Sequence, residues 1–322
     1  MNRIDVHHHF IPPAYEDVSK ASNGDPTGWV PVKWTIQGSL DLMKLLNTHT
    51  AILSMTAPGP ELLEGKAAAD FCRATNEYAS QLCKRHPGQI GFFAYLPPLI
   101  GNKKAALEEI AYALDVLKAD GIGLFTRYGT GNYYLGHKEF QWLWDELDKR
   151  EAVVHVHPTG SVDATPVNKA LPQPVIDYPH ETTRAAVDLL ITNTVKDHPN
   201  VKIILSHTGG TLPYLAHRAA NLTYDTGLSD KSPEEFLEEA SSFYFDLALS
   251  ATPLTLDLSL KFAKPDHVLF GTDFPYAPKK TIERYANALD HYEMDEETRY
   301  SVSRGAAVKL FPRFRDFIDN KK

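Results

Sequence analysis

The 322-residue sequence lacks a long apolar run, an excess of positive charge and all but two cysteines. No uninterrupted apolar stretch approaches the roughly 20 residues that a membrane-spanning helix requires, so we expect no membrane association. The chain carries 33 Lys and Arg residues against 41 Asp and Glu residues, and the net charge of −8 disfavours non-specific nucleic-acid binding. No basic segment followed by an apolar stretch precedes the first predicted strand, so we expect a cytoplasmic location.

The two cysteines give little scope for covalent cross-linking. Cys72 and Cys83 fall in one predicted helix, over residues 61–86. At a rise of ~1.5 Å per residue this separation corresponds to about 16 Å, which is well beyond disulfide reach. We therefore expect two free thiols, as is usual in a reducing compartment.

The sequence does contain a regular alternation of short apolar runs and helical stretches. The predicted strands, each followed by a predicted helix, cover residues 4–9, 51–55, 90–96, 121–125, 153–157, 201–205, 243–247 and 267–270. Such an alternation predicts a closed (β/α)8 barrel, the TIM barrel, with residues 1–322 forming a single domain. An open, doubly wound α/β sheet is the alternative, but no Gly-rich dinucleotide-binding fingerprint follows any predicted strand, which disfavours it.

Two connections are too long to be plain loops. Residues 11–39 follow the first predicted strand, and residues 158–179 follow the fifth. Both leave the carboxyl ends of strands, where barrel enzymes build their sites. We expect residues 11–39 to form a lid and residues 158–179 to form a wall of a pocket.

The first predicted strand ends in three consecutive histidines, His7, His8 and His9. Side chains two positions apart on a strand share a face, so His7 and His9 can aim at one point while His8 is turned away. Two neutral imidazoles at this spacing suit a divalent ion such as zinc or manganese. A remnant of a purification tag is the alternative, but a tag rarely lies inside an apolar strand.

Three other predicted strands end in side chains that can bind a metal or move a proton. His157 ends the fifth strand, His207 follows the sixth, and Asp273 follows the eighth. Because the carboxyl ends of barrel strands face a common mouth, we expect these side chains to meet the histidines of the first strand. The combination strengthens the prediction of a metal site.

The motifs at these strand ends carry a family resemblance. Asp-x-His-x-His near the start, His-Pro after strand five, Ser-His-x-Gly-Gly after strand six and Gly-Thr-Asp-Phe-Pro after strand eight resemble the amidohydrolase superfamily. More narrowly, they are similar to the branch of aminocarboxymuconate semialdehyde decarboxylase and its aromatic-acid decarboxylase relatives. The opening Ile-Asp-Val-His-His-His-Phe-Ile-Pro-Pro, with Ala-Pro-Gly after strand two, further resembles fungal 6-methylsalicylate decarboxylases. The resemblance spans nearly the whole chain and implies a homodimer or a higher homo-oligomer.

The resemblance also implies the roles of the site residues. One divalent metal ion, Zn²⁺ or Mn²⁺, is bound by His7, His9, His157 and Asp273, and His207 lies beside it as the acid/base residue. Two-metal relatives carry a bridging lysine at the end of strand four. Here that strand ends Leu-Phe-Thr-Arg, so a single metal is implied. Deaminases place a glutamate shortly after the strand-six histidine, where this chain has Gly-Gly, so deamination is disfavoured.

Four residues are candidates for contacts with a substrate. Phe10, Trp29 and Met55 could wall an aromatic ring, and Arg127 could clamp a carboxylate in a bidentate manner. The alternatives are that the apolar side chains only close the core and that the arginine forms a surface ion pair.

Two more polar residues lie within predicted strands. His155 shares a face with His157 but lies one layer deeper, so we expect it in the core or beside a ligand. Asp5 points the same way as His7 and His9 on an ideal strand. It either orients a ligand or fills the floor of the barrel.

The activity implied is metal-dependent, non-oxidative decarboxylation of an ortho-hydroxy aromatic carboxylic acid, a carbon–carbon lyase reaction such as 6-methylsalicylate to m-cresol plus CO₂. A salicylate-type substrate can chelate the metal, and Asp273 or His207 then protonates the ring carbon that carries the carboxylate. Two alternatives remain on the same barrel. One is hydrolysis of a lactone or amide, and the other is decarboxylation of a muconate semialdehyde.

Overall fold

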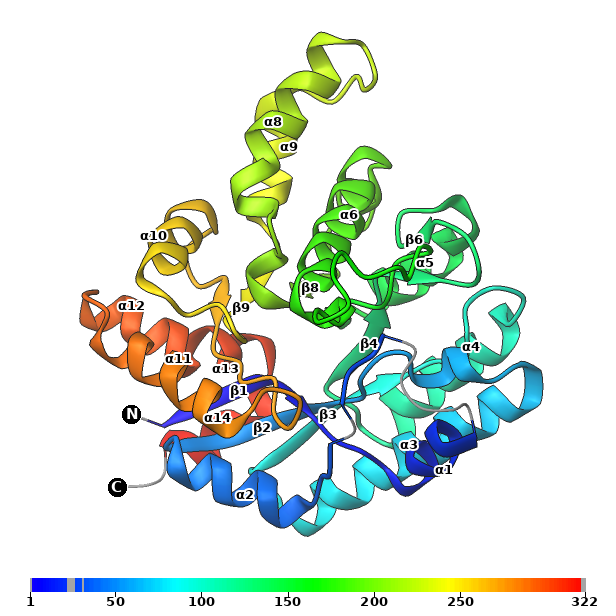
Figure 1. Ribbon diagram of the computed structural model, residues 1–322, viewed down its shortest axis with the longest axis vertical. Coiled ribbons are helices and arrows are strands. Elements are labelled where there is room, and N and C mark those ends of the chain that lie inside the picture. The colour runs from blue at the N-terminus through cyan, green and yellow to red at the C-terminus, as the bar shows by residue number, and fades with distance from the viewer. Residues whose placement is uncertain (1, 22–26, 31, 320–322) are drawn as a thin grey trace.

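The computed structural model describes residues 2–21, 27–30 and 32–319, and its fold is a (β/α)8 barrel (Figure 1). Parallel strands neighbour one another in chain order. They are β1 (Arg3–His9), β2 (Thr48–Ser54), β3 (Ile90–Tyr95), β4 (Gly121–Phe125), β7 (Val153–His157), β8 (Lys202–Leu205), β9 (Tyr244–Asp246) and β10 (Val268–Leu269). This confirms the predicted fold class.

The barrel closes between its first and last strands. The amide of Val6 donates to the carbonyl oxygen of Phe270 at 3.0 Å, and a parallel bridge joins His8 to Phe274. The segment that follows β10 is therefore held directly against the histidine-bearing end of β1.

Helices form the outer layer, as Figure 1 shows. They are α1 (Pro13–Ala21), α2 (Ile36–Leu45), α3 (Gly65–Arg85), α4 (Lys103–Ala111), α5 (Gln141–Lys149), α6 (Asp177–Ile191), α7 (Thr194–Asp197), α8 (Leu212–Asp225), α9 (Pro233–Ser241), α10 (Pro253–Phe262), α11 (Lys279–His291), α12 (Glu296–Tyr300), α13 (Ala306–Leu310) and α14 (Arg315–Asp319). Both cysteines lie on α3 as free thiols. Within the described ranges, no helix combines the length and apolarity that crossing a bilayer requires.

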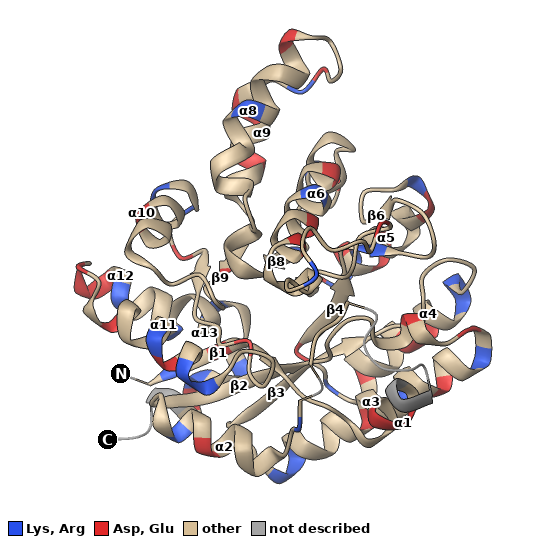
Figure 2. Ribbon diagram, in the orientation of Figure 1, with Lys and Arg blue, Asp and Glu red and all other residues tan. Residues whose placement is uncertain are grey.

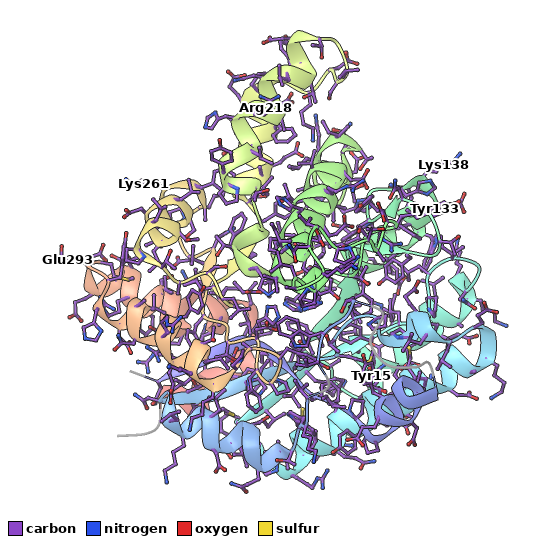
Figure 3. All side chains as sticks on the ribbon, viewed as in Figure 1. Tyr15, Tyr133, Lys138, Arg218, Lys261 and Glu293 are labelled. Atoms are coloured by element: carbon purple, nitrogen blue, oxygen red, sulfur yellow. The ribbon has the colours of Figure 1, made fainter. Side chains whose placement is uncertain are left out.

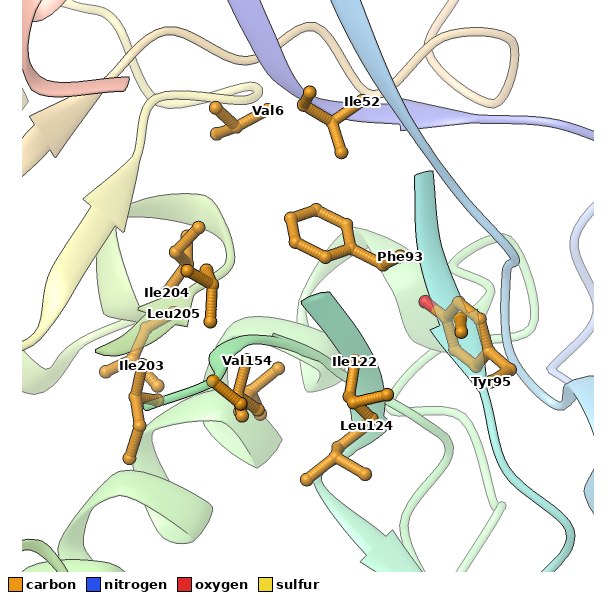
Figure 4. Packing of buried hydrophobic residues seen from close by; sticks show 14 of the residues in the cluster. Val6, Ile52, Phe93, Tyr95, Ile122, Leu124, Val154, Ile203, Ile204 and Leu205 are labelled. Atoms are coloured by element: carbon orange, nitrogen blue, oxygen red, sulfur yellow. The ribbon is translucent and has the colours of Figure 1, made fainter. Parts of the chain in front are cut away.

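Apolar side chains fill the space around the strands (Figure 4). Ile52, Phe93, Ile122 and Val154 come from neighbouring strands, and each is fully buried. Strands that are buried on both faces consist of near-continuous apolar runs. The barrel strands could therefore be recognised in the sequence. Charged side chains of both signs lie mainly on the outer helices (Figure 2), and Lys261 and Glu293 extend outward from that layer (Figure 3).

The two long connections meet at the end of the barrel that carries the strand carboxyl ends. The first, residues 11–39, contains α1 and the beginning of α2; its residues 22–26 and 31 lie outside the described chain. The second, residues 158–179, contains a short 3-10 helix, Gln173–Val175. The amide of Gln173 donates to the carbonyl oxygen of Thr27 at 3.1 Å, which ties the two connections together.

Several elements have no counterpart among the predicted ones. One is the hairpin β5 (Arg127–Tyr128) and β6 (Tyr133–Tyr134), which follows β4. Another is α9, which packs against α8, and the two helices form the arm that projects in Figure 1. The start of α9 has a capping box, since Ser232 and Glu235 each accept the other's backbone N–H. The sequence Ser-Pro-Glu-Glu carried this signal.

Candidate metal centre

Strand β1 delivers two imidazoles to one point. His7 and His9 are fully buried, and their Nε2 atoms lie 3.0 Å apart. His8 points away, with its Nδ1 2.9 Å from Asp5 and its Nε2 2.9 Å from Ser39 Oγ. A register irregularity between Asp5 and His8 interrupts the ideal alternation, so Asp5 does not join the two inward histidines. Asp5 instead accepts the backbone N–H groups of His7 and Thr272, each at 3.1 Å, and so fixes β1 to the loop after β10.

His157, at the end of β7, and Asp273, in the loop after β10, complete a four-residue cluster with His7 and His9. Asp273 Oδ1 lies 3.0 Å from His9 Nε2 and 3.4 Å from His7 Nε2. One ligand atom from each of the four residues lies within 4.8 Å of the others, and all four residues are buried. The structure thus brings together the four side chains that the sequence motifs predicted as metal ligands.

The hydrogen bonds around the cluster set the tautomer of each histidine. In every case Nδ1 faces an acceptor outside the cluster: His7 faces Asp246 Oδ2 at 2.9 Å, His9 the carbonyl oxygen of Ser54 at 3.2 Å, and His157 the carbonyl oxygen of Pro158 at 2.7 Å. Since these acceptors require a proton on Nδ1, each neutral ring presents an Nε2 lone pair to the centre. When all three rings are neutral, three lone pairs and one carboxylate converge and repel one another unless a cation lies between them; without a metal, a proton on His7 relieves this repulsion. The donor set therefore fits one divalent metal ion.

The charges inside the cluster agree with this assignment. Burial lowers the pKa of His9 and holds the pKa of His157 well below its usual value, so both rings are neutral. Burial by itself would raise the pKa of Asp273, but the neighbouring imidazoles of His207, His7 and His9 outweigh burial and hold this pKa well below its usual value. Asp273 is therefore an anion, as a metal ligand must be.

Metal binding should release a proton from His7. Burial lowers the pKa of His7, but Asp246 and Asp273 outweigh burial and raise it to about 10. The metal-free ring is therefore protonated near neutral pH, and a metal can take Nε2 only by displacing that proton. We expect release of about one proton per metal and an affinity that rises about tenfold per pH unit below this pKa. Calorimetric titration in two buffers with different ionisation enthalpies measures the released protons, and a value near zero would contradict the assignment of His7.

Asp246, at the end of β9, lies against the metal centre and was not among the predicted site residues. Its side chain is fully buried, and it contacts His7 Nδ1 at 2.9 Å and His155 Nε2 at 3.4 Å. Burial would raise the pKa of Asp246, but the neighbouring histidines outweigh it and hold the pKa below the usual value. The signal in the sequence was a lone carboxylate at the end of the apolar run 243–247.

His155 lies beneath the metal centre. Its ring stacks on Phe93 with centroids 5.1 Å apart, and burial lowers its pKa to about 4. Ligand atoms of His7, His155 and Asp246 also lie within 4.8 Å of one another. His7 Nδ1 carries the hydrogen that Asp246 accepts, so this second group is a hydrogen-bonded chain that supports the first cluster.

His207 lies beside the cluster, on the turn after β8. Its Nε2 is 3.9 Å from Asp273 Oδ2, and its side chain is 11% exposed. The backbone of His207 and Thr208 is left-handed, with φ of 53° and 57°. The following Gly210 passes so close to helix α6 that an added Cβ would lie 1.8 Å from the carbonyl oxygen of Pro179. This packing explains Gly210, and Gly209 has a φ of 70° and leaves no room for a Cβ beside Phe245.

A cavity of about 550 Å³ opens above the cluster. His157, His207 and Asp273 lie among its lining residues, and its walls include the aromatic rings of Trp29, Tyr178, Tyr276 and Tyr285. No lysine or arginine is among the described residues that line it. Positive charge in this cavity must therefore come from a bound metal or from protonated histidine.

Of the four residues predicted to contact a substrate, the structure places Trp29 in this cavity and the other three elsewhere. Phe10 packs between Trp34 and Tyr78 in the core, and Met55 is fully buried. Arg127 lines a separate cavity of about 630 Å³, where its guanidinium donates to the carbonyl oxygens of Gly160 and Gly129. The hairpin that begins at Arg127 carries this side chain away from the metal centre.

Comparison with known proteins gives consistent matches over the whole chain. The family model described as Amidohydrolase matches residues 4–313. A decarboxylase from Penicillium terrestre is 53% identical over 100% of this chain and 98% of its own length. The 6-methylsalicylic acid decarboxylase of Penicillium expansum is 49% identical, with 100% of both chains covered. A dihydroxybenzoic acid decarboxylase from Polaromonas, solved with manganese and the inhibitor 2-nitroresorcinol, superposes with a TM-score of 0.80 over 97% of both chains at 20% identity.

Proposed function

This chain belongs to the amidohydrolase family, and we propose that it is a metal-dependent decarboxylase of an ortho-hydroxy aromatic acid, converting 6-methylsalicylate to m-cresol and CO₂. The observation that carries the proposal is the position of the His7, His9, His157 and Asp273 cluster. Two members of the cluster, His157 and Asp273, line a cavity with His207, and four aromatic side chains contribute to its walls. The two decarboxylase relatives, which match this chain over nearly their full lengths, support the same reaction class.

We propose Mn²⁺ or Zn²⁺ as the metal. Three imidazole nitrogens and one carboxylate suit either ion. The manganese in the Polaromonas structure, which shares this fold, supports the first choice. When bound, the metal supplies Lewis acidity and an anchor for the carboxylate and ortho-hydroxyl oxygens of the substrate.

The cavity walls orient the substrate. Because no lysine or arginine lines the cavity among the described residues, the acid group is driven toward the metal centre and the ring toward Trp29, Tyr178 and Tyr276. A carboxylate directed elsewhere in this cavity would lose its hydration without gaining a cation in return.

His207 is the proposed proton donor, and Asp273 is its anionic neighbour. The neighbouring imidazoles hold the pKa of Asp273 well below its usual value, which favours the role of an anion for Asp273, and His207 Nε2 lies 3.9 Å from Asp273 Oδ2. The proton passes from His207 to the ring carbon that bears the carboxylate. The carbon–carbon bond then breaks, CO₂ leaves, and the bonding electrons return to the ring and restore its aromaticity. His207 recovers a proton from the solvent through the cavity.

Comparison of hydroxybenzoate isomers tests the proposed substrate class. If the ortho oxygen anchors the ring, 6-methylsalicylate and salicylate should release CO₂, and the para-hydroxy isomer should react at least about 10³-fold more slowly, because it loses both an anchor and phenolate stabilisation. In D₂O the phenol should carry one deuterium at the carbon that held the carboxylate. Equal rates for the ortho and para isomers would rule out the two-point anchor. Lactone hydrolysis without any CO₂ release would assign the protein to the hydrolases instead.

A further inference from the structure

The carboxylate of Asp246 joins two parts of the site that lie far apart in the sequence. Asp246 Oδ2 accepts the Nδ1 proton of His7 at 2.9 Å. Asp246 Oδ1 accepts the backbone N–H groups of His207, at 3.1 Å, and of Ala248, at 3.0 Å. A fully buried side chain therefore connects the end of β1 with the turn after β8.

We propose that Asp246 is a positioning residue that fixes the metal ligand His7 and the proton donor His207 at the same time, and so couples metal binding to the geometry of proton transfer. The inference rests on the proposed function for the role of His207. Neither the family match nor the four-residue ligand cluster indicates these two roles for Asp246.

The contact with His7 sets which ring nitrogen faces the metal. A carboxylate oxygen only accepts hydrogen bonds when ionised, so the proton of the neutral His7 ring must be on Nδ1. The lone pair then lies on Nε2, which points at His9 and Asp273. The short contact also fixes the plane of the ring.

The contact with His207 holds a backbone conformation that is unfavourable by itself. Non-glycine residues rarely occupy the left-handed region, and two consecutive residues, His207 and Thr208, do so here. The amide of His207 donates to the Asp246 carboxylate, and Thr208 Oγ1 donates to the backbone carbonyl oxygen of Asp246 at 3.3 Å. These bonds hold the turn that directs the His207 ring toward Asp273.

Asparagine cannot perform both tasks. The carboxylate accepts hydrogen bonds through both oxygens, whereas a carboxamide has one acceptor oxygen and one donor NH₂ group. If the NH₂ group faces His7, the ring must move its proton to Nε2 and lose its lone pair for the metal. If the NH₂ group faces the turn, it opposes the two backbone N–H groups of His207 and Ala248. Either orientation breaks one of the two contacts, and exchange between orientations weakens both.

The test compares Asp246→Asn with Asp120→Asn, measured on metal-stripped protein. Asp120 is a buried carboxylate before β4, at the opposite end of the barrel, where it pairs with Arg313 and accepts the amide of Phe92. In Asp246→Asn we expect the dissociation constant for Mn²⁺ to rise by about 10- to 100-fold, as is typical when a partner of a ligating histidine is lost. Amide hydrogen exchange in residues 206–209 should accelerate by about tenfold or more. Asp120→Asn should change neither quantity.

Turnover at saturating metal separates positioning from general weakening. Asp246→Asn should lower kcat with little change in KM, and the same substitution in a His207→Gly background should cost much less, because the residue being positioned is gone. An unchanged Mn²⁺ dissociation constant or an unchanged exchange rate at residues 206–209 would overturn the dual role.

If Asp246→Asn does not fold, the wild-type protein provides the test. Mn²⁺ loading should slow amide hydrogen exchange at residues 206–209, and an unchanged rate would refute the coupling. The metal and exchange measurements need no substrate, so failure of the proposed decarboxylation would not be mistaken for failure of this inference.

Discussion

Replacing Asp273 by asparagine should strip the metal and lower turnover by about 10³-fold or more. Asp273 supplies the one negative charge among the four clustered ligands, and its Oδ1 lies within 3.4 Å of both His7 Nε2 and His9 Nε2. Asparagine keeps the shape of the side chain but loses that charge, and a neutral amide is a much weaker ligand for a divalent ion. Metal content after gel filtration and kcat with 6-methylsalicylate measure the two effects.

The control for this substitution is again Asp120→Asn, which removes a buried carboxylate at the far end of the barrel. Asp120 pairs with Arg313, so its loss should lower the free energy of unfolding while the metal content stays at the wild-type level. His157→Gln should behave like Asp273→Asn, because His157 Nε2 is the ligand from the opposite strand. Full metal occupancy in Asp273→Asn would exclude Asp273 from the ligand set.

The fold and the meeting of the strand-end side chains were predictable from the sequence for one physical reason, whereas the choice of four of them as metal ligands came from the family resemblance. Parallel barrel strands all end at the same rim, so residues such as His9 and His157 are brought together by topology alone. A strand-end position can be recognised from a local pattern of apolar residues followed by a polar one. No contact between distant segments has to be guessed to place such residues in one site.

The misplaced substrate residues show where local patterns stop being informative. Arg127 follows a strand end as the metal ligands do, but the unpredicted β5–β6 hairpin turns it toward a different cavity. Phe10 continues the histidine strand, yet its ring packs under Trp34 in the core. The direction of a side chain just past a strand depends on the loop that follows it. Loop conformation is set by packing between distant segments, which periodicity does not report.

Asp246 was missed for a related reason. In the sequence it is a single acidic residue in the apolar run 243–247, and the strand prediction is satisfied without it. Its role exists only once β1 and the turn after β8 lie on either side of it. A buried carboxylate is costly unless it is hydrogen-bonded, so an acidic residue inside a predicted barrel strand is itself a reason to look for such partners.

His207→Asn should retain the metal and lose about 10²-fold or more in kcat, because it removes the proposed proton donor and leaves the four clustered ligands in place. Asparagine tolerates the left-handed backbone at this position better than most residues, so the turn should persist. His198→Asn is the matched control, since His198 is a buried histidine that pairs with Asp145 on an outer helix. It should keep both metal and turnover.

His207→Gly sharpens this test, because glycine adopts φ near 53° without strain and leaves a hole the size of an imidazole beside Asp273. Free imidazole added to this variant should enter the cavity and restore part of the lost kcat, with a dependence on pH that follows the imidazolium form. It should have no such effect on Asp273→Asn, which lacks the metal. Metal-loaded His207→Asn that turns over at half the wild-type rate or faster, together with no imidazole rescue of His207→Gly, would remove His207 from proton transfer. The proton would then have to come from another donor in the cavity, either Asp273 or a water molecule.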